Sequence, residues 1–308
     1  MASEKNLTAV FTDIANAIRE KKGTTEQIKP INMADEIANL SQTTAESGTI
    51  KSLLDATRRC SYLFLGYSGT NIDRLISYTD TSNVIDMSNM FNNCSSITTI
   101  PQLDTSKVTI MQNMFSSCSK LIDIPELNTS NVTNMYGMFM DCSSLVTIPQ
   151  FDTSNVTSMS AMFSGCSSLV TIPQLNTSNV RNMDTTFSDC ISLTSIPQLD
   201  TSKVEGMFRT FRSCSNLTTI PQINVSKVTG MNSIFSGCSS LKTILMYGMK
   251  VNFDISASTK FEESDLVTIL NNLATVTSTK TLTMGATNLA KLTDEEKAIA
   301  TNKGWTLK

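Results

Sequence analysis

A repeat of 24 residues constrains this chain more than any other feature of its sequence. Seven of the eight cysteines are spaced by this step, and phenylalanine, methionine and valine recur at the same interval. The periodic cysteines are Cys94, Cys118, Cys142, Cys166, Cys190, Cys214 and Cys238. Such a period is the signature of a solenoid, in which each unit buries its apolar face only against its neighbours. Seven copies therefore predict one long stack.

Three local patterns occur within each unit, which reads D/N-T-S-N/K-V-x-x-M-x-x-M-F-x-x-C-S-x-L-x-x-I-P-Q-L. In residues 87–94, two methionines, a phenylalanine and a cysteine have the i, i+3, i+4, i+7 spacing of one helix face. Residues 98–100 favour a short strand, which the following proline ends because it donates no ladder hydrogen bond. Residues 104–106 have the composition of a turn. The unit predicts an α/β solenoid, a parallel stack of short strand–turn–short helix coils.

The segment 152–169 closely resembles a known repeat. It reads DTSNVTSMSAMFSGCSSL, which resembles the BspA-like leucine-rich repeat in the form D-T-S-N-V-T-x-M-x-x-M-F-x-x-C-S-S-L. The resemblance covers a little over half of the chain. It implies a leucine-rich-repeat-like, curved solenoid of the kind found on surface or adhesion proteins of bacteria and their phages.

The N-terminal side of the array departs from the pattern. Cys60 lies 34 residues before Cys94, which is one period plus ten. We interpret residues 51–78 as a degenerate capping repeat with about ten residues inserted after Cys60. The regular leucine-rich repeat solenoid then occupies residues 79–250.

Beyond the array, residues 251–308 are expected to form a small α/β C-terminal cap, because an exposed solenoid end needs covering. The apolar spacing, a Thr-Asp-Glu-Glu helix start and a glycine stop define its elements. They are a helix over 262–274, a strand over 280–284, a helix starting at Thr293 and ending before Gly304, and a last strand over 305–307.

Residues 1–41 carry two short amphipathic segments, followed by a Ser/Thr-rich linker over 42–50. Two short helices bury too little apolar surface to stand alone, so this helical segment is predicted to anchor the chain to a partner. The candidate anchoring residues are Leu7, Phe11, Ile14, Ile18 and Ile37.

A second resemblance concerns both ends of the chain. Residues 7–40, LTAVFTDIANAIREKKGTTEQIKPINMADEIANL, resemble the N-terminal segment of tail and other structural proteins of phages and prophages of gut bacteria. Residues 281–307 resemble the end of such proteins. The resemblance implies attachment to a virion through residues 1–41.

The chemistry of the repeated side chains points to structure and not to catalysis. The periodic cysteines occupy one column of the buried face, where a free cysteine acts as a small apolar filler. The chain has no C-x-x-C pair and no histidine, which excludes Ser-His-Asp and Cys-His catalysis and His-ligated zinc. We expect buried reduced thiols, methionines in the core, and no catalytic residue, metal or cofactor.

A second column holds four aspartates and three asparagines, which are Asp80, Asp104, Asn128, Asp152, Asn176, Asp200 and Asn224. Glycoside hydrolysis uses a pair of carboxylates, and Asp104 and Asp152 would lie about 9–10 Å apart at the usual strand spacing. The motif, however, recurs in every coil, and nearly half of its members are amides. We therefore interpret the column as a ladder of turns.

The exposed positions that vary most between units lie between the two methionines. They carry Gln-Asn, Tyr-Gly, Ser-Ala, Asp-Thr and Phe-Arg in successive units. Tyrosine, phenylalanine and arginine are residue types that anchor interfaces. The candidate partner-binding residues are Tyr136, Arg181, Phe208, Arg209 and Arg212. Neutral variation on a solvent face, and binding through the strand face instead, remain as alternatives.

Charge and hydropathy narrow the class of partner. With 24 basic and 27 acidic residues the net charge is −3, so the chain has no electrostatic footprint for nucleic acid or anionic membranes. It has no apolar run of about 18 residues that would span a bilayer. Its start lacks the pattern of a signal peptide, which suggests synthesis in a host cytoplasm.

These observations predict a non-enzymatic phage virion protein, such as a tail fibre, baseplate or head-fibre component. Residues 1–41 would contact other virion proteins, and the solenoid would bind a bacterial surface protein or glycan. Many weak contacts would be multiplied by copy number on the particle, and a homo-oligomer fits that arrangement. The alternatives are a BspA-like bacterial surface adhesin and a purely structural capsid decoration protein.

Overall fold

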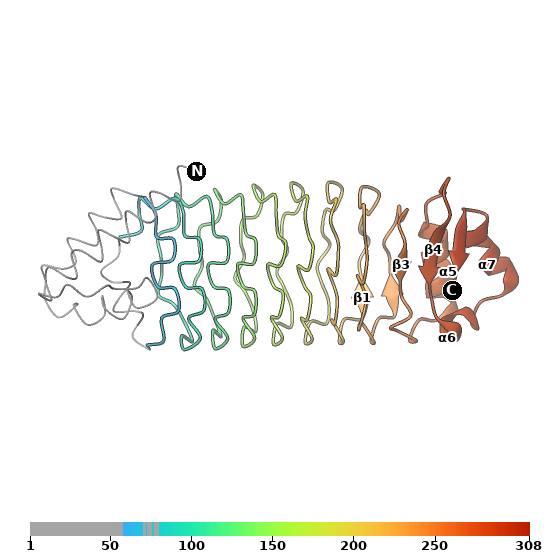
Figure 1. Ribbon diagram of the computed structural model, residues 1–308, viewed down its shortest axis with the longest axis horizontal. Coiled ribbons are helices and arrows are strands. Elements are labelled where there is room, and N and C mark those ends of the chain that lie inside the picture. Colours follow the sequence, from blue (N-terminus) through green and yellow to red (C-terminus); the bar gives the residue numbers. More distant parts are fainter. Residues whose placement is uncertain (1–57, 70–71, 73–75, 77–79) are drawn as a thin grey trace, which may run out of the picture.

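The computed structural model describes residues 58–69, 72, 76 and 80–308, and it shows an elongated stack of coils with a small α/β layer at its C-terminal end (Figure 1). A leading coil, residues 58–67, is followed by seven coils of 24 residues. Coils 1 to 7 are residues 80–103, 104–127, 128–151, 152–175, 176–199, 200–223 and 224–247. Parallel bridges join each coil to the next, from Arg59↔Asp86 to Gly206↔Gly230. The predicted parallel stack is confirmed.

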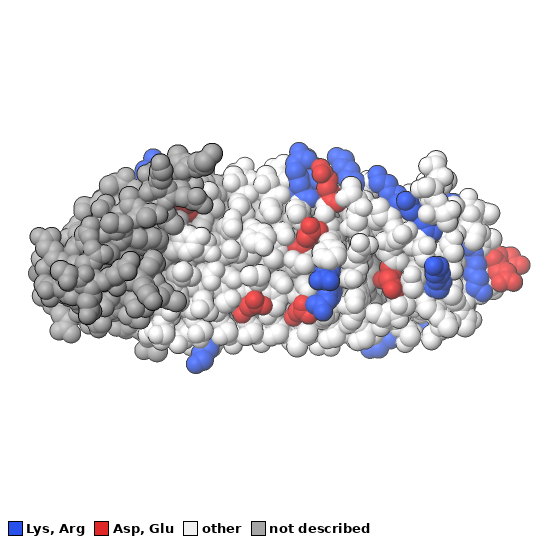
Figure 2. Space-filling view, viewed as in Figure 1, with Lys and Arg blue, Asp and Glu red and all other residues white. Residues whose placement is uncertain are grey.

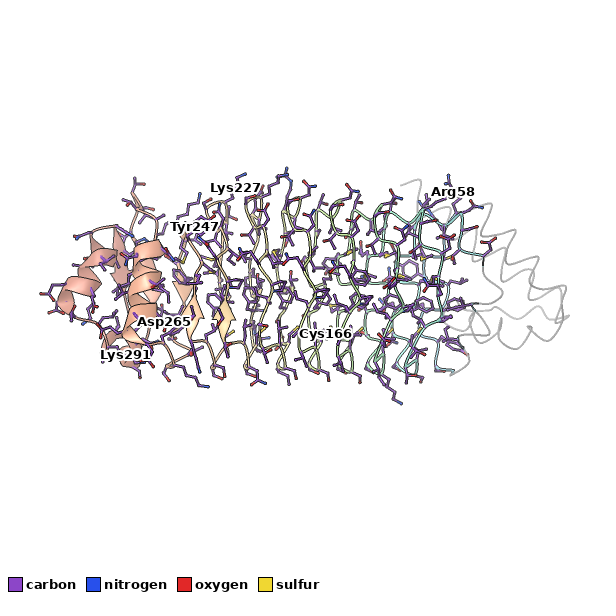
Figure 3. All side chains as sticks on the ribbon, turned by 180° about the vertical axis from the view of Figure 1, so that it is seen from behind. Arg58, Cys166, Lys227, Tyr247, Asp265 and Lys291 are labelled. Carbon is purple, nitrogen blue, oxygen red and sulfur yellow. The ribbon has the colours of Figure 1, made fainter. Side chains whose placement is uncertain are left out.

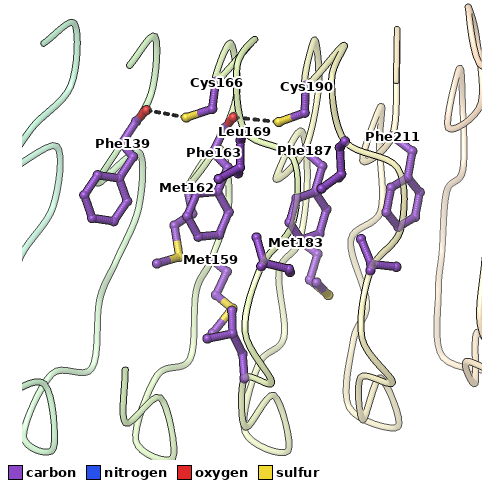
Figure 4. Packing of buried hydrophobic residues seen from close by; sticks show 14 of the residues in the cluster. Phe139, Met159, Met162, Phe163, Cys166, Leu169, Met183, Phe187, Cys190 and Phe211 are labelled. Carbon is purple, nitrogen blue, oxygen red and sulfur yellow. Dashed lines mark hydrogen bonds between the residues drawn. The ribbon is translucent and has the colours of Figure 1, made fainter. Parts of the chain in front are cut away.

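Each apolar position of the repeat forms a continuous column inside the stack (Figure 4). The phenylalanine rings lie nearly parallel, with centroids of successive rings 5.4–6.0 Å apart. This column is Phe64, Phe91, Phe115, Phe139, Phe163, Phe187, Phe211 and Phe235. Burying one such side chain is worth about 1.5–3 kcal/mol, so the columns supply the main favourable term for stacking. The interior is therefore packed with side chains along its length (Figure 3).

The predicted short helix in each coil is wrong. Residues 87–94 form successive turns, because alternate backbone N–H groups serve different partners. Met90 and Cys94 donate within the coil to carbonyls three residues back, whereas Phe91 donates 2.9 Å to Met114 of the next coil. Asn89 and Asn93 adopt positive φ to allow this alternation. Half of the helix hydrogen bonds are replaced by bonds between coils.

The predicted short strand is confirmed only near the C-terminal end. There β1 (Thr219–Ile220) pairs in parallel with β2 (Thr243–Ile244). In earlier coils the equivalent segments are not strands, and neighbouring coils share at most one backbone bond there, such as Ile122 N to Thr98 O at 2.9 Å. One bond per coil is too few for a ladder, so those segments do not become strands.

The interpretation of Cys60 as an early member of the cysteine column is wrong. Its N–H donates to Asp86 just as Met87 donates to Ile110, which places Cys60 in the methionine column. The ring of Phe64 stacks on Phe91, 27 residues later, so the leading coil is three residues longer than a regular one and not ten. The rest of the predicted capping repeat over 51–78 lies partly outside the described residues.

The C-terminal layer contains the elements that its sequence predicts, together with two short ones that it does not. A parallel three-stranded sheet has the order β3-β4-β5, with three helices beside it. The elements are β3 (Phe253–Asp254), α5 (Glu263–Asn272), β4 (Lys280–Thr283), α6 (Ala286–Leu289), α7 (Asp294–Thr301) and β5 (Trp305–Leu307). The helices α5 and α7 and the strands β4 and β5 confirm the prediction, whereas β3 and α6 are too short for a periodic signal.

The C-terminal layer is bonded directly to the last coil. Thr243 Oγ1 donates to Asp265 Oδ1 of α5 at 3.0 Å, and Ser258 Oγ donates to the Leu241 carbonyl at 2.6 Å. A buried edge-to-face contact between Phe253 and Trp305, 5.9 Å between ring centroids, lies in the layer's own core. These contacts continue the stack and cover its end.

The predicted anchoring residues lie outside the described residues, as does the predicted linker over 42–50. They are Leu7, Phe11, Ile14, Ile18 and Ile37.

A candidate binding surface on the solenoid

The aspartate and asparagine column is a ladder of turns, as predicted. In each coil the Oδ1 atom accepts from the backbone N–H two residues later, for example Ser106 N to Asp104 at 3.0 Å and Ser154 N to Asp152 at 3.0 Å. Hydrogen bonding by these serines lowers the pKa of both carboxyl groups. The carboxylates are ionised at neutral pH and hold the backbone turn.

The cysteines are free and buried, which confirms their predicted structural role. Each periodic thiol donates to the carbonyl of a phenylalanine in the preceding coil, as Cys166 does to Phe139 and Cys190 to Phe163, both at 3.0 Å (Figure 4). Burial raises the pKa of the Cys142 thiol to about 12. A thiol that stays protonated is a poor nucleophile and metal ligand.

Four of the five predicted partner-binding residues lie on the adjacent coils 5 and 6. We call the charged and aromatic cluster there the variable patch, which is Arg181, Asp184, Asp189, Glu205, Phe208, Arg209 and Arg212. Arg181 Nη1 lies 3.2 Å from Glu205 Oε1, and Arg212 Nη1 lies 3.0 Å from Asp189 Oδ2. Because both pairs are exposed, each contributes at most about 1 kcal/mol to stability.

Arg209 is the arginine of the variable patch that forms no ion pair within the described residues. Its guanidinium lies 4.7 Å from the centroid of the half-exposed Phe208 ring. Arg209 also has a φ of 53°, and Thr185 at the equivalent position of coil 5 has a φ of 55°. Every regular coil has positive φ at this position, including Asn89, Asn113, Gly137, Ala161 and Ser233, so the angle belongs to the repeat and does not distinguish coils 5 and 6.

Tyr136 is not part of the variable patch. It occupies the same column as Phe208 and is similarly exposed, but it belongs to coil 3 and Phe208 to coil 6. At about 4.8 Å per coil the two side chains are roughly 14 Å apart. Three carboxylates of the patch, Asp184, Asp189 and Glu205, were not predicted from the sequence. Each bonds to a residue about one repeat away, and local spacing does not reveal such a partner.

Charged residues are unevenly spread along the stack. Figure 2 shows them mainly over the C-terminal half of the visible face. Residues 127–180 contain only two charged side chains, Asp141 and Asp152. The variable patch therefore begins where a long, sparsely charged stretch ends.

The strand face, the alternative binding surface, carries a row of exposed β-branched side chains. Ile122, Val146 and Val170 occupy the same column in coils 2 to 4 and are 51%, 41% and 40% exposed. Threonines continue the column on both sides, at Thr98 and Thr194. This row spans more coils than the variable patch but is chemically more uniform.

A polar groove of about 970 Å³ runs across coils 3 to 6 beside the turn ladder. Its lining includes equivalent residues of three coils: Gln150, Gln174 and Gln198 from the glutamine column, and Asp152, Asn176 and Asp200 from the turn ladder. The sequence offered one signal for it, since an exposed glutamine follows the proline in nearly every coil although it fills no core position.

In the described part of the chain, no three His, Cys, Asp or Glu side chains are placed together to hold a metal ion. No helix found there has the length and apolar character needed to cross a membrane.

Residues 58–169 and 146–247 match a protein family described as Mycoplasma protein of unknown function, DUF285. The two overlapping matches include the leading coil and all seven regular coils, which is more than half of the chain. No curated protein matches the chain.

Among solved structures, the chain is similar to a leucine-rich repeat protein of T. pallidum, with 18% identity over 73% of this chain and 79% of that chain, and a TM-score of 0.27. It is also similar to an internalin from Listeria monocytogenes, with 14% identity over 85% of this chain and 93% of that chain, and a TM-score of 0.20. The family match, which rests on the repeats themselves, is the more informative comparison.

Proposed function

This chain belongs to the family described as Mycoplasma protein of unknown function, DUF285, and from that premise we propose that it is a non-enzymatic binding scaffold of the surface or adhesion type. The solenoid engages a protein or glycan on a bacterial surface, and the variable patch makes the principal contact. The stack provides the rigid support, because its interior is filled by columns of side chains that leave only the outer positions free to vary.

The variable patch carries this proposal. It gathers Phe208, Arg209 and Arg212, which are residue types that dominate binding energy in interfaces, within one turn segment. The guanidinium of Arg209 has no ion pair within the described residues and remains available to a partner.

The variant for the test takes its replacement residues from the equivalent positions of other coils, where the same backbone already accepts them. The variant Arg181→Thr/Phe208→Asn/Arg209→Ser copies the residues of coils 4 and 7 at the same columns, so it keeps the fold. We expect the full chain carrying it to bind host bacteria about tenfold or more weakly in a cytometry titration.

The control Lys107→Asn removes an exposed charge far from the patch and copies Asn83 and Asn131. It should bind as the parent does. If the triple variant binds as tightly as the parent, the patch is not the contact surface.

We further propose that the scaffold is carried on a phage particle, with residues 1–41 as the attachment segment. The resemblance of residues 7–40 to phage structural proteins supports this part, and the alternatives are an adhesin on a bacterial cell and a capsid decoration protein. Mass spectrometry of purified particles should detect the chain, and deletion of residues 1–41 should remove it from them. A chain found on bacterial cells and absent from particles would favour the adhesin; a chain on particles that does not bind cells would favour decoration.

A further inference from the structure

The groove across coils 3 to 6 presents a row of hydrogen-bonding atoms that the fold does not use. The glutamine Nε2 atoms hold neighbouring coils together, as Gln150 does by donating to the Gln174 carbonyl at 2.6 Å and Gln174 by donating to that of Gln198 at 2.5 Å. Their Oε1 atoms accept no hydrogen bond within the described residues. One side of the groove is thus lined by a row of free amide oxygens, one from each of coils 3, 4 and 5.

The other side of the groove is equally regular. Asp152, Asn176 and Asp200 each use Oδ1 to accept from a serine N–H, at 2.9–3.1 Å. Each carboxyl group also receives a hydrogen bond from its serine side chain and keeps further lone pairs for a ligand. Nδ2 of the asparagine makes no hydrogen bond to any described residue. Successive coils therefore offer an acceptor, a donor and an acceptor, all exposed.

The spacing of these atoms selects the class of ligand. The two carboxylates are two coils, about 10 Å, apart, and this is too far for both to coordinate one cation at about 2.3–2.6 Å. An extended peptide rises about 3.3 Å per residue and falls out of step with the coils. One pyranose of an extended β-linked glycan advances by about the thickness of a coil, and each of its hydroxyls can both donate and accept.

We propose that this groove binds a linear, uncharged β-linked glycan, with one sugar unit lying against each coil. Its volume lies within the range of about 300–1,000 Å³ typical of ligand sites. Hydrogen bonding by serines lowers the pKa of Asp152 and Asp200, so both are negatively charged at neutral pH and repel anionic polymers. The groove shares no residue with the variable patch, and the proposal does not rest on the proposed function.

The full chain would be titrated with cellohexaose and chitohexaose by calorimetry, with maltohexaose, which is α-linked and coiled, as the control ligand. We expect binding of at least one β-linked hexamer and weaker or no binding of maltohexaose. The variant Asp152→Asn/Asp200→Asn should bind that hexamer about tenfold more weakly, because two charged acceptors become donors.

Asparagine already occupies this column at Asn128 and Asn224, so the double variant keeps its turns. The matched control Asp104→Asn lies in the same column outside the groove and should keep the parent's affinity. The variant of the variable patch should also keep it, which separates this site from the proposed cell-binding surface. The proposal is overturned if neither β-linked hexamer binds, if maltohexaose binds equally well, or if Asp104→Asn weakens binding as much as the double variant.

Discussion

A single cysteine per coil has two structural tasks in this protein. Its sulfur fills space in the buried core, and its S–H group donates a second hydrogen bond to a phenylalanine carbonyl that already accepts a backbone N–H, as the Phe91 carbonyl does from Cys94 N at 3.1 Å and from the Cys118 thiol at 3.0 Å. A carbonyl oxygen has two lone pairs, so the thiol adds a hydrogen bond between coils that alanine could not make. The burial of these residues follows from the sequence pattern, whereas the carbonyl partner depends on the neighbouring coil.

Because several buried thiols have raised pKa values, the free energy of unfolding should depend on pH. Burial raises the pKa of Cys142 and of Cys238 to about 12, above an unfolded value of about 8.5. Between these pH values the folded state binds more protons than the unfolded state, so the free energy of unfolding falls as pH rises. Each such thiol contributes up to about 1.4 kcal/mol per pH unit to this fall.

Urea unfolding measured between pH 8 and pH 11 under reducing conditions checks this slope. The variant Cys142→Ala/Cys238→Ala should show a shallower decline than the parent, although it starts from a lower stability. Equal slopes in the two proteins would contradict the assignment to these thiols.

At the scale of the element, the C-terminal layer contains the regular helices α5 and α7. There the helices have local start and stop signals, and α7 begins with a capping box in which Thr293 Oγ1 accepts from Glu296 N at 3.2 Å. Such signals lie within a few residues of each other and are readable from the sequence. The segment 87–94 also has helical spacing of its apolar residues and a cap-type residue before it, since Asp86 Oδ1 accepts from Ser88 N at 2.9 Å, yet it forms turns.

The capping box of α7 should contribute measurably to the free energy of unfolding. Thr293→Ala removes the acceptor for the N–H of Glu296, and it should lower the free energy of unfolding by about 1 kcal/mol. Thr301→Ala, at the other end of the same helix, is the control and should change it by less than about 0.5 kcal/mol. Chemical denaturation of the two variants and the parent checks the difference; a loss for Thr301→Ala as large as for Thr293→Ala would contradict the capping role.

At the scale of the whole molecule, the stack behaves as a one-dimensional array. Each regular coil bonds to the coil before it and the coil after it, through bridges such as Ile110↔Asn134 and Asn134↔Ser158. Stability in such an array is close to a sum of coil terms and contacts between neighbours. The uniform period lets one coil replace another without change of register.

Removal of one complete coil is therefore expected to leave a folded protein. Deleting residues 152–175 brings Phe139 onto Phe187 and keeps every column continuous. The free energy of unfolding should fall by about 1–4 kcal/mol, from roughly 0.05–0.15 kcal/mol per residue. Circular dichroism and urea unfolding measure this. Deletion of residues 152–163 alone breaks the columns and should prevent cooperative folding; an equal effect of both deletions would contradict the array description.

The sequence by itself determined the period, the identity of each buried column, the turn ladder and the main helices and strands of the C-terminal layer, because these depend on residues close in the chain or on exact repetition. Only the tertiary structure decided the rest. It showed that residues 87–94 are turns, that Cys60 lies in the methionine column, and that Arg181 meets Glu205 in the variable patch. The physical reason is common to all three: the partner atoms come from the adjacent coil, about 24 residues away, and local spacing does not reveal them.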